Sequence, residues 1–135
     1  MSFEEIPHTA DIKIRARAPT LASLFSEILK ALMQVMYGES RGKTLKKEIS
    51  LTGEDTESLL LDFLSEILYI SEVEAIVFAD ARIIIKNNAL HAVLQGEPFD
   101  IRKHSGGTEV KGISYSGLLI SSDANGYMAE IVFDV

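Results

Sequence analysis

The sequence has 135 residues, a formal net charge of −7 and no cysteine, and 47% of its residues are hydrophobic. A chain of this length fits a single domain, residues 1–135, that can bury a core without disulfides or a structural metal. The lack of cysteine excludes thiolate zinc sites and cysteine nucleophiles, and the acidic balance disfavours non-specific binding to nucleic acid. The sequence shows no basic and apolar leader and no apolar run near the ~20 residues that span a bilayer, so we expect a cytoplasmic protein without a membrane segment.

The first element expected from the sequence is a strand, and a helix follows it. Residues 11–18 (DIKIRARA) alternate apolar and basic side chains, which is typical of a half-buried strand. Thr20 is a suitable N-cap for a helix that runs to about Tyr37, because apolar residues recur there every three or four positions. Gly38 is well placed to end this helix.

Residues 39–47 (ESRGKTLKK) are predicted to form a solvated loop before a short alternating strand at 48–53 (EISLTG). A second helix is predicted to begin after Asp55 or Thr56, because either residue can serve as its N-cap. Its apolar side chains follow the helical period at Leu59, Leu60, Phe63, Leu64, Ile67 and Leu68. The helix is more apolar than one buried face requires, so we expect it to lie between other elements or to be partly covered by a partner.

The second half of the chain changes to short strands. Residues 75–86 (AIVFADARIIIK) predict one long strand, or two strands with a bend near Asp80. Asn87 and Asn88 are typical of a two-residue hairpin turn, and 89–98 (ALHAVLQGEP) is the strand expected after it.

Two more strands are expected at 108–121 (TEVKGISYSGLLIS) and 127–135 (YMAEIVFDV), with the turn residues SDANG between them. The predicted order is strand, helix, strand, helix and then four strands. This order is typical of an α+β fold in which two helices pack on one face of a mixed, mostly antiparallel β-sheet.

One aspartate stands beside each terminal strand of the prediction. Taken alone, Asp11 is explained by a local hydrogen bond to backbone, and Asp134 by exposure to solvent at a strand end. If the terminal strands are neighbours, however, Asp11, Asp134 and the terminal carboxylate at Val135 form a cluster of anions. Such a cluster repels itself unless a cation neutralises it. Oxygen donors without His or thiolate select Mg²⁺, Ca²⁺ or Mn²⁺ rather than Zn²⁺.

No other motif indicates self-contained catalysis. The glycine pair Gly106–Gly107 is too short a signal for a phosphate-binding loop and is expected to form a plain turn. The three histidines, His8, His91 and His104, are far apart in sequence and lack the spacing of a helical zinc site. His91 lies in an alternating strand, where a surface or packing role is the simplest interpretation.

Five stretches of the chain resemble, in order, the archease family. They are IPHTADIKIRA, TLASLFSEILKALMQVM, SLLLDFLSEILYI, GEPFDIRKHSGGTEVKGISYSGLLI and AEIVFDV. The most specific parts are the His-Thr-Ala-Asp stretch, the Lys-His pair before a Glu-Val-Lys-Gly strand, and the final Phe-Asp-Val. The resemblance covers nearly the whole chain.

The resemblance implies an accessory protein, not itself an enzyme, that acts on an RtcB-type RNA ligase. That ligase joins the RNA ends left by tRNA splicing, using GTP and Mn²⁺. Archeases speed guanylylation of the ligase's active-site histidine, let the ligase turn over repeatedly, and in some cases broaden the nucleotides that it accepts. The resemblance also implies a metal site at Asp11, Asp134 and a backbone or terminal oxygen of Val135, with Ca²⁺ as the usual ion and Mg²⁺ or Mn²⁺ as alternatives. RNA is then expected to be contacted only indirectly, through the ligase.

Four further residues lie in family-like stretches, and we consider them as supporting or partner contacts. His8 is close to Asp11 in sequence and could orient it by a hydrogen bond. Lys103 and His104 could contact phosphate or carboxylates of the ligase, and Lys111 is a further candidate for a supporting or partner contact. For all four, a solvated loop or strand face is the alternative interpretation.

Two other functions compete with ligase activation. A metal-dependent phosphoester hydrolase would use the same carboxylates, but no nucleophile or general base is evident beside them in the sequence. A general chaperone is suggested by the very apolar second helix. Turnover by the purified protein alone would favour the first function, and suppression of client aggregation would favour the second.

Overall fold

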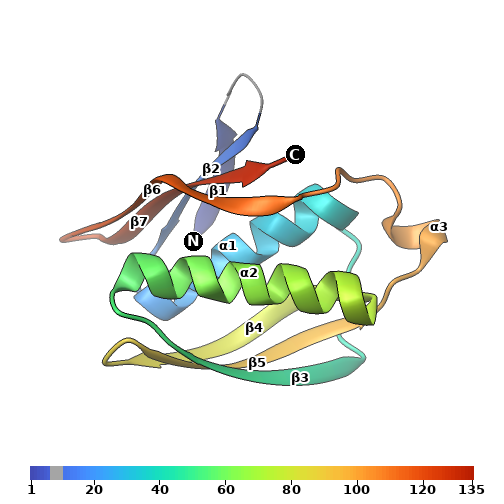
Figure 1. The fold of residues 1–135 in the computed structure, drawn as a ribbon, viewed down its shortest axis with the longest axis horizontal. Coiled ribbons are helices and arrows are strands. Elements are labelled where there is room, and N and C mark those ends of the chain that lie inside the picture. The colour runs from blue at the N-terminus through green and yellow to red at the C-terminus, as the bar shows by residue number, and fades with distance from the viewer. Residues whose placement is uncertain (7–10) are drawn as a thin grey trace.

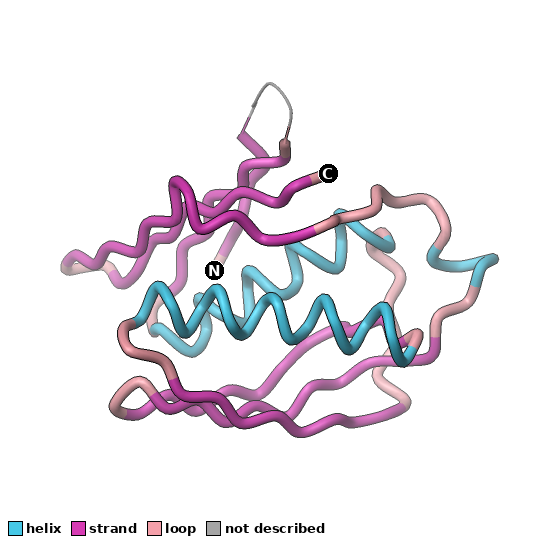
Figure 2. The backbone as a smooth tube through the Cα atoms, in the orientation of Figure 1, coloured by secondary structure: helices cyan, strands magenta, loops and turns pink. Residues whose placement is uncertain are grey.

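Two antiparallel sheets lie on either side of the two long helices in the computed structural model, which describes residues 1–6 and 11–135 (Figure 1). The first sheet consists of β1 (Ser2–Ile6), β2 (Ile12–Ala18), β7 (Gly126–Asp134) and β6 (Gly112–Asp123), in that order. The second consists of β3 (Leu45–Thr52), β5 (Ala89–Pro98) and β4 (Ile76–Lys86), in that order. The helices are α1 (Leu21–Tyr37), α2 (Thr56–Glu74) and the short α3 (Ile101–His104). Figure 2 shows α1 and α2 as the middle layer.

Both long helices begin at the N-caps that the sequence predicts. The Thr20 hydroxyl accepts the N–H of Ser23, and the Ser23 hydroxyl accepts the N–H of Thr20, so the two residues form a reciprocal capping box. Gly38, with φ of +85°, ends α1 as expected. The Asp55 carboxylate starts α2 by accepting the N–H of Ser58 at 2.8 Å. In the described part of the chain, no helix is long and apolar enough to cross a membrane.

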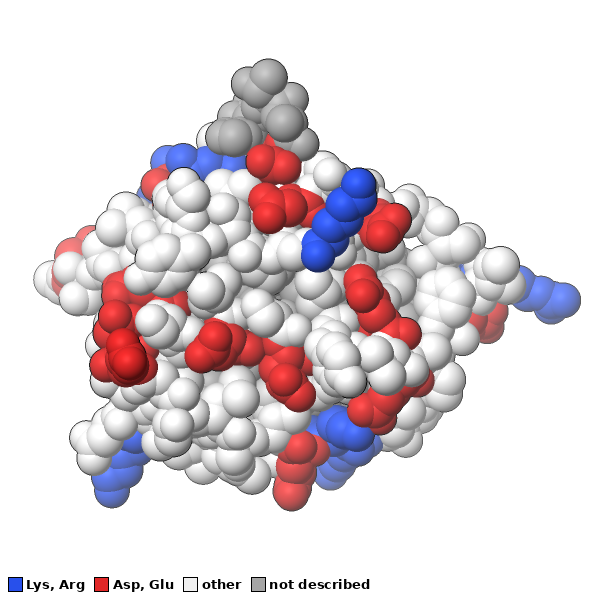
Figure 3. Space-filling model, in the orientation of Figure 1, with Lys and Arg blue, Asp and Glu red and all other residues white. Residues whose placement is uncertain are grey.

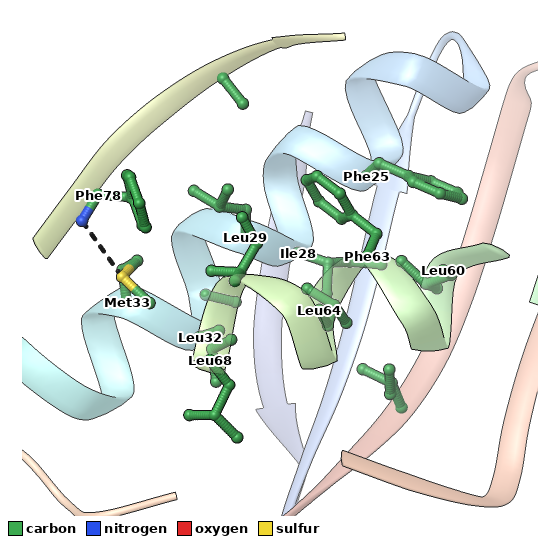
Figure 4. Close-up of a cluster of buried hydrophobic side chains, with 14 of the residues drawn as sticks. Phe25, Ile28, Leu29, Leu32, Met33, Leu60, Phe63, Leu64, Leu68 and Phe78 are labelled. Carbon is green, nitrogen blue, oxygen red and sulfur yellow. Dashed lines mark hydrogen bonds between the residues drawn. The ribbon is translucent and has the colours of Figure 1, made fainter. Parts of the chain in front are cut away.

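The helices meet through a single hydrophobic core. The rings of Phe25 on α1 and Phe63 on α2 lie with their centroids 5.8 Å apart, and both side chains are fully buried. Figure 4 shows the two rings among aliphatic side chains of the same helices. At the edge of this cluster, the backbone N–H of Phe78 on β4 donates to the sulfur of Met33 on α1 at 3.4 Å (Figure 4). The core therefore joins both helices to the second sheet.

The α+β class is confirmed, but the strands form two sheets rather than the single sheet expected. Helix α1 packs against β4 of the second sheet and β2 of the first, and α2 packs against β6, β4 and β3. Each helix is therefore covered from two sides, which accounts for the surplus of apolar residues in α2. All strand pairs among the described residues are antiparallel. Alternation in a sequence shows which face of a strand is buried, but not which sheet contains the strand.

The predicted hairpin in the second half is confirmed in detail. Asn87 and Asn88 have φ values of 52° and 59°, as a two-residue type I′ turn requires. The strand β4 is continuous, and its register with β5 shifts between Phe78 and Asp80. The bend predicted near Asp80 is thus a β-bulge within one long strand.

Several boundaries differ from the sequence prediction. The edge strand β1 was not expected, because its short segment lacks a clear alternation. The strand β3 begins at Leu45 rather than at residue 48, because backbone pairing with β5 extends through its polar residues Lys46 and Lys47. The strand β6 begins at Gly112 rather than at residue 108, and the short helix α3 was also not predicted. In each case the pairing or packing partner, rather than the local pattern, sets the boundary.

Candidate metal centre at the ends of two neighbouring strands

The two strands that carry the aspartates are neighbours, as the metal hypothesis requires. Strand β2 pairs antiparallel with β7, and Ile12 lies opposite Phe133 in this register. Asp11 directly precedes Ile12, and Asp134 directly follows Phe133. Because the strands are antiparallel, both aspartates stand at the same end of the same strand pair.

The pleat of the two strands decides the side on which these aspartates stand. Ile14, Ile131 and Phe133 point to the helices and are at most 1% exposed. Side chains alternate along a strand, so Asp134 stands on the outer face of the sheet and remains half-buried. Gly112 of β6 lies opposite Asp134. A Cβ atom at Gly112 would lie 3.7 Å from Oδ2 of Asp134, so the carboxylate lies directly beside this glycine.

An ion network further along the same outer face is already neutralised. Nη2 of Arg15 on β2 lies 2.7 Å from Oε2 of Glu130 on β7, and Nζ of Lys13 lies 3.9 Å from Oε1 of Glu130. The hydrogen bond from Arg15 is the main cause that lowers the pKa of the Glu130 carboxyl. The same contact raises the pKa of Arg15. Glu130 is therefore satisfied within the sheet and has no need of an added cation.

The donor atoms at Asp11 and Asp134 fit a divalent cation that prefers oxygen. Neither aspartate forms an ion pair with any residue that the structure describes. Among those residues there is also no group of three His, Cys, Asp or Glu side chains that could hold a metal. Within residues 1–6 and 11–135, further ligands would be backbone oxygens, such as that of the exposed Val135, and water or a partner could supply others.

Lys111 lies next to Asp134 and contacts it through its backbone. Its N–H donates to the carbonyl oxygen of Asp134 at 2.7 Å, and its side chain is exposed. The segment before it is fixed on α1, because the N–H of Thr108 donates to the carbonyl of Val35 at 2.8 Å. Gly107 makes this approach possible, since a Cβ there would overlap the carbonyl of Met36. The segment that leads into β6 is thus anchored on α1 and on Asp134.

His104 is a structural residue in this conformation, not an exposed contact for a partner. It is 1% exposed and packs against the rings of Tyr37 and Phe99, with centroids 6.3 and 5.9 Å away. Its Nδ1 accepts the N–H of Asp100 at 3.0 Å, so the hydrogen-bond pattern assigns the proton to Nε2. That nitrogen donates to Oε2 of Glu97 at 3.0 Å. In this conformation the His104 side chain is therefore engaged inside the protein rather than at its surface.

Glu97, which the sequence analysis did not single out, is the centre of this cluster. Its carboxylate accepts from Nζ of Lys103 at 2.7 Å and from the N–H of Gly42 at 2.6 Å, besides the bond from His104. Lys103 is exposed and remains a candidate for contact with a partner. His8 lies outside the described residues. No periodicity in the sequence marks Glu97, and only its position before the Lys-His pair could have drawn attention to it.

The Glu97 cluster predicts a loss of stability in acid. The hydrogen bonds from Lys103 and then from Gly42 are the main causes that lower the pKa of Glu97 to about 2, from its ordinary value of 4.5. A carboxyl whose pKa is lower in the folded state stabilises the fold above its unfolded pKa and loses this contribution as pH falls. We therefore expect the free energy of unfolding, measured with urea, to decrease between pH 4.5 and pH 2 partly through this residue.

The variant Glu97→Gln isolates this contribution. We expect it to be less stable than wild type at pH 7 and to lose less stability than wild type across the acid range. The change Glu48→Gln, at an exposed position of β3, is the matched control and should leave the profile unchanged. Parallel profiles for Glu97→Gln and wild type would contradict the prediction.

Comparison with known proteins supports the family that the sequence suggested. The chain matches the Archease protein family (MTH1598/TM1083) over residues 3–135. Protein archease of Methanosarcina acetivorans is 37% identical over 98% of this chain and 95% of its own. Protein archease of Pyrococcus furiosus is 37% identical over 98% of both chains.

Solved structures agree in fold. The solution structure of protein 1598 from Methanobacterium thermoautotrophicum has a TM-score of 0.81 and 26% identity, with 99% of both chains covered. The crystal structure of an archease from Thermotoga maritima, described as a possible chaperone, has a TM-score of 0.66 and 22% identity, with 98% of this chain and 96% of the other covered.

The fold and the strand-end carboxylates define a small α+β protein with a candidate divalent-cation centre at one end of the central strand pair of its first sheet. Together with the family match over nearly the whole chain, they place it plainly: the chain belongs to the archease family.

Proposed function

We propose that this protein activates an RtcB-type RNA ligase by promoting guanylylation of the ligase and its repeated turnover. Membership in the archease family supports the proposal. The single observation that carries it is the pairing of β2 with β7, which brings Asp11 and Asp134 to one end of the first sheet. The protein's own residues would hold and present an ion, while the bond-forming chemistry would remain with the ligase.

The centre would hold Ca²⁺, Mg²⁺ or Mn²⁺ through Asp11, Asp134 and a backbone oxygen of Val135. When bound, such a dication offsets negative charge on a transferring phosphoryl group. The two aspartates would fix the ion at the strand ends. The anchored segment before β6 would keep Lys111 beside them, where its ammonium can meet a phosphate. Because the protein supplies only a few ligands, coordination positions remain for water, nucleotide or ligase groups.

The test is a guanylylation assay of the ligase with GTP, with and without this protein. At the Mn²⁺ concentration that the ligase needs, added protein should increase the rate of guanylylation and allow several ligations per ligase molecule. Repeating the assay with Mg²⁺ or Ca²⁺ added identifies the effective ion, and calorimetry with this protein alone should show binding of about one ion per chain. Equal rates with and without the protein under all ion conditions would refute the proposal.

A general chaperone is a second candidate, favoured by exposed apolar side chains on α2. Tyr69 is 61% exposed and Val73 is 64% exposed, and large exposed apolar groups often mark interaction sites. This function predicts that the protein suppresses aggregation of unrelated clients, and that Asp11→Ala has no effect on suppression. Ligase activation predicts instead that Asp11→Ala abolishes stimulation of the ligase. In the same assays, phosphoester turnover without ligase would instead indicate a hydrolase.

A further inference from the structure

Helix α2 presents one side to solvent at the open edge of the middle layer. The residues of this side recur every three or four positions, so they form one stripe along the helix. They are Asp62, Ser65, Glu66, Tyr69, Glu72 and Val73, and we call them the α2 face. The opposite side of the helix is the buried one that carries Phe63.

The α2 face combines negative charge with exposed apolar groups. Helix α2 contains acidic residues but no Lys or Arg, and Figure 3 shows red acidic side chains along it on the face toward the viewer. Tyr69 and Val73, four residues apart and therefore on one side, are 61% and 64% exposed. Tyrosine is enriched in protein interfaces and among the residues that dominate binding energy, and interfaces have a polar rim around an apolar centre.

The α2 face is structurally connected to the candidate metal centre. Helix α2 packs against β6. The first residue of β6, Gly112, lies opposite Asp134. In Figure 1, α2 lies at the front of the molecule with β6 directly above it and the end of β7 beyond. A large partner that reaches Asp11 and Asp134 can therefore also cover α2.

The negative charge of the α2 face distinguishes between the partners that could bind there. In a two-fold dimer formed through the α2 face, equivalent acidic side chains would face one another, and their repulsion opposes that arrangement. An enzyme that binds RNA and nucleotide, by contrast, needs basic surfaces to attract phosphates. A basic rim of that kind is complementary to the α2 face.

We propose that the α2 face is a docking surface for a basic region of the RNA ligase next to its nucleotide site. This inference rests on the proposed function, since it takes the ligase as the partner. Tyr69 and Val73 are the apolar anchors of this contact, and the surrounding carboxylates steer the two proteins together. The face contributes to affinity, whereas the metal centre contributes to the stimulation that follows binding.

The experiment measures the dissociation constant between the full-length protein and the ligase, together with maximal guanylylation at saturating protein. The double variant Tyr69→Ala/Val73→Ala should raise the dissociation constant by about tenfold or more. It should still reach the wild-type maximum of guanylylation. The variant Asp62→Lys/Glu66→Lys should slow association at low salt, and this difference should shrink as salt is added.

The control is Ile84→Ala. Ile84 is also an exposed apolar residue, at 69% exposure, but it lies on β4 of the second sheet and is not part of the α2 face. This variant should bind like wild type. Unchanged binding by the Tyr69/Val73 variant, or loss of its maximal stimulation at unchanged affinity, would overturn the docking role. A wild-type dimer that the same variant dissociates would also overturn it, in favour of self-association. If the wild-type protein binds the ligase without stimulating it, the proposed function fails, but the dissociation constants of the variants still decide the docking role. If the wild-type protein does not bind the ligase, the proposed function and the docking role both fail.

Discussion

The variants Asp11→Asn and Asp134→Asn should each fold normally and lose ligase stimulation. An amide keeps the size of the side chain but removes the negative charge that holds a divalent cation. Substitutions of residues that merely orient metal ligands typically lower metal affinity by about 10- to 100-fold, and loss of a direct ligand should cost no less. Guanylylation rates at limiting metal, with calorimetric ion binding, measure the effect.

The control for these variants lies in the β6–β7 hairpin, at the opposite end of β7 from Asp134. Asp123 is the last residue of β6, and its carboxylate accepts the N–H of Asn125 in the hairpin turn. Asp123→Asn preserves that acceptor and removes the same charge from the same sheet, so it should stimulate like wild type. If Asp11→Asn and Asp134→Asn also stimulate fully, the metal-centre interpretation is wrong.

The variant Phe63→Ala should lower the free energy of unfolding by about 3–5 kcal/mol, the usual cost of emptying a buried aromatic site. Phe63 is fully buried and packs against the tilted ring of Phe25 where α1 and α2 meet. A loss of this size is a large part of the about 5–15 kcal/mol that stabilises a typical domain. Unfolding in urea, followed by circular dichroism, measures it.

Tyr69→Ala on the same helix provides the comparison. Tyr69 is 61% exposed, so its removal should change the free energy of unfolding by no more than about 0.5 kcal/mol. This result is also required for the binding experiment, because it shows that the α2 face can be altered without harm to the fold. Equal losses of unfolding free energy for Phe63→Ala and Tyr69→Ala would contradict the assignment of a buried side and an exposed side to α2.

Local chemistry made much of the fold predictable. The cap residues Thr20 and Asp55 and the turn at Asn87–Asn88 each satisfy specific backbone groups, so their signals are short-range and readable in one sequence. The division into two sheets depends on which distant strands pair. The edge strand β1 forms because its backbone pairs with that of β2. No local pattern in the sequence predicts such a pairing partner.

The candidate site likewise has features that the sequence alone predicts and features that it does not. The alternation in AEIVFDV puts Ala129, Ile131 and Phe133 on one face of the strand, and all three are buried in the structure. That Asp11 stands at the same strand end follows only from the register of two strands far apart in sequence. The Glu97 cluster could not be predicted, because its members come from the end of β5, from α3 and from the loop after α1.

The ladder between β2 and β7 joins an early strand to the final one. Closing so long a loop costs chain entropy, and pairings of this kind tend to form late in folding. A nascent chain still emerging from the ribosome therefore carries Asp11 without its companion. Capture of a cation by the two aspartates, as proposed above, would therefore have to wait until β2 and β7 have paired.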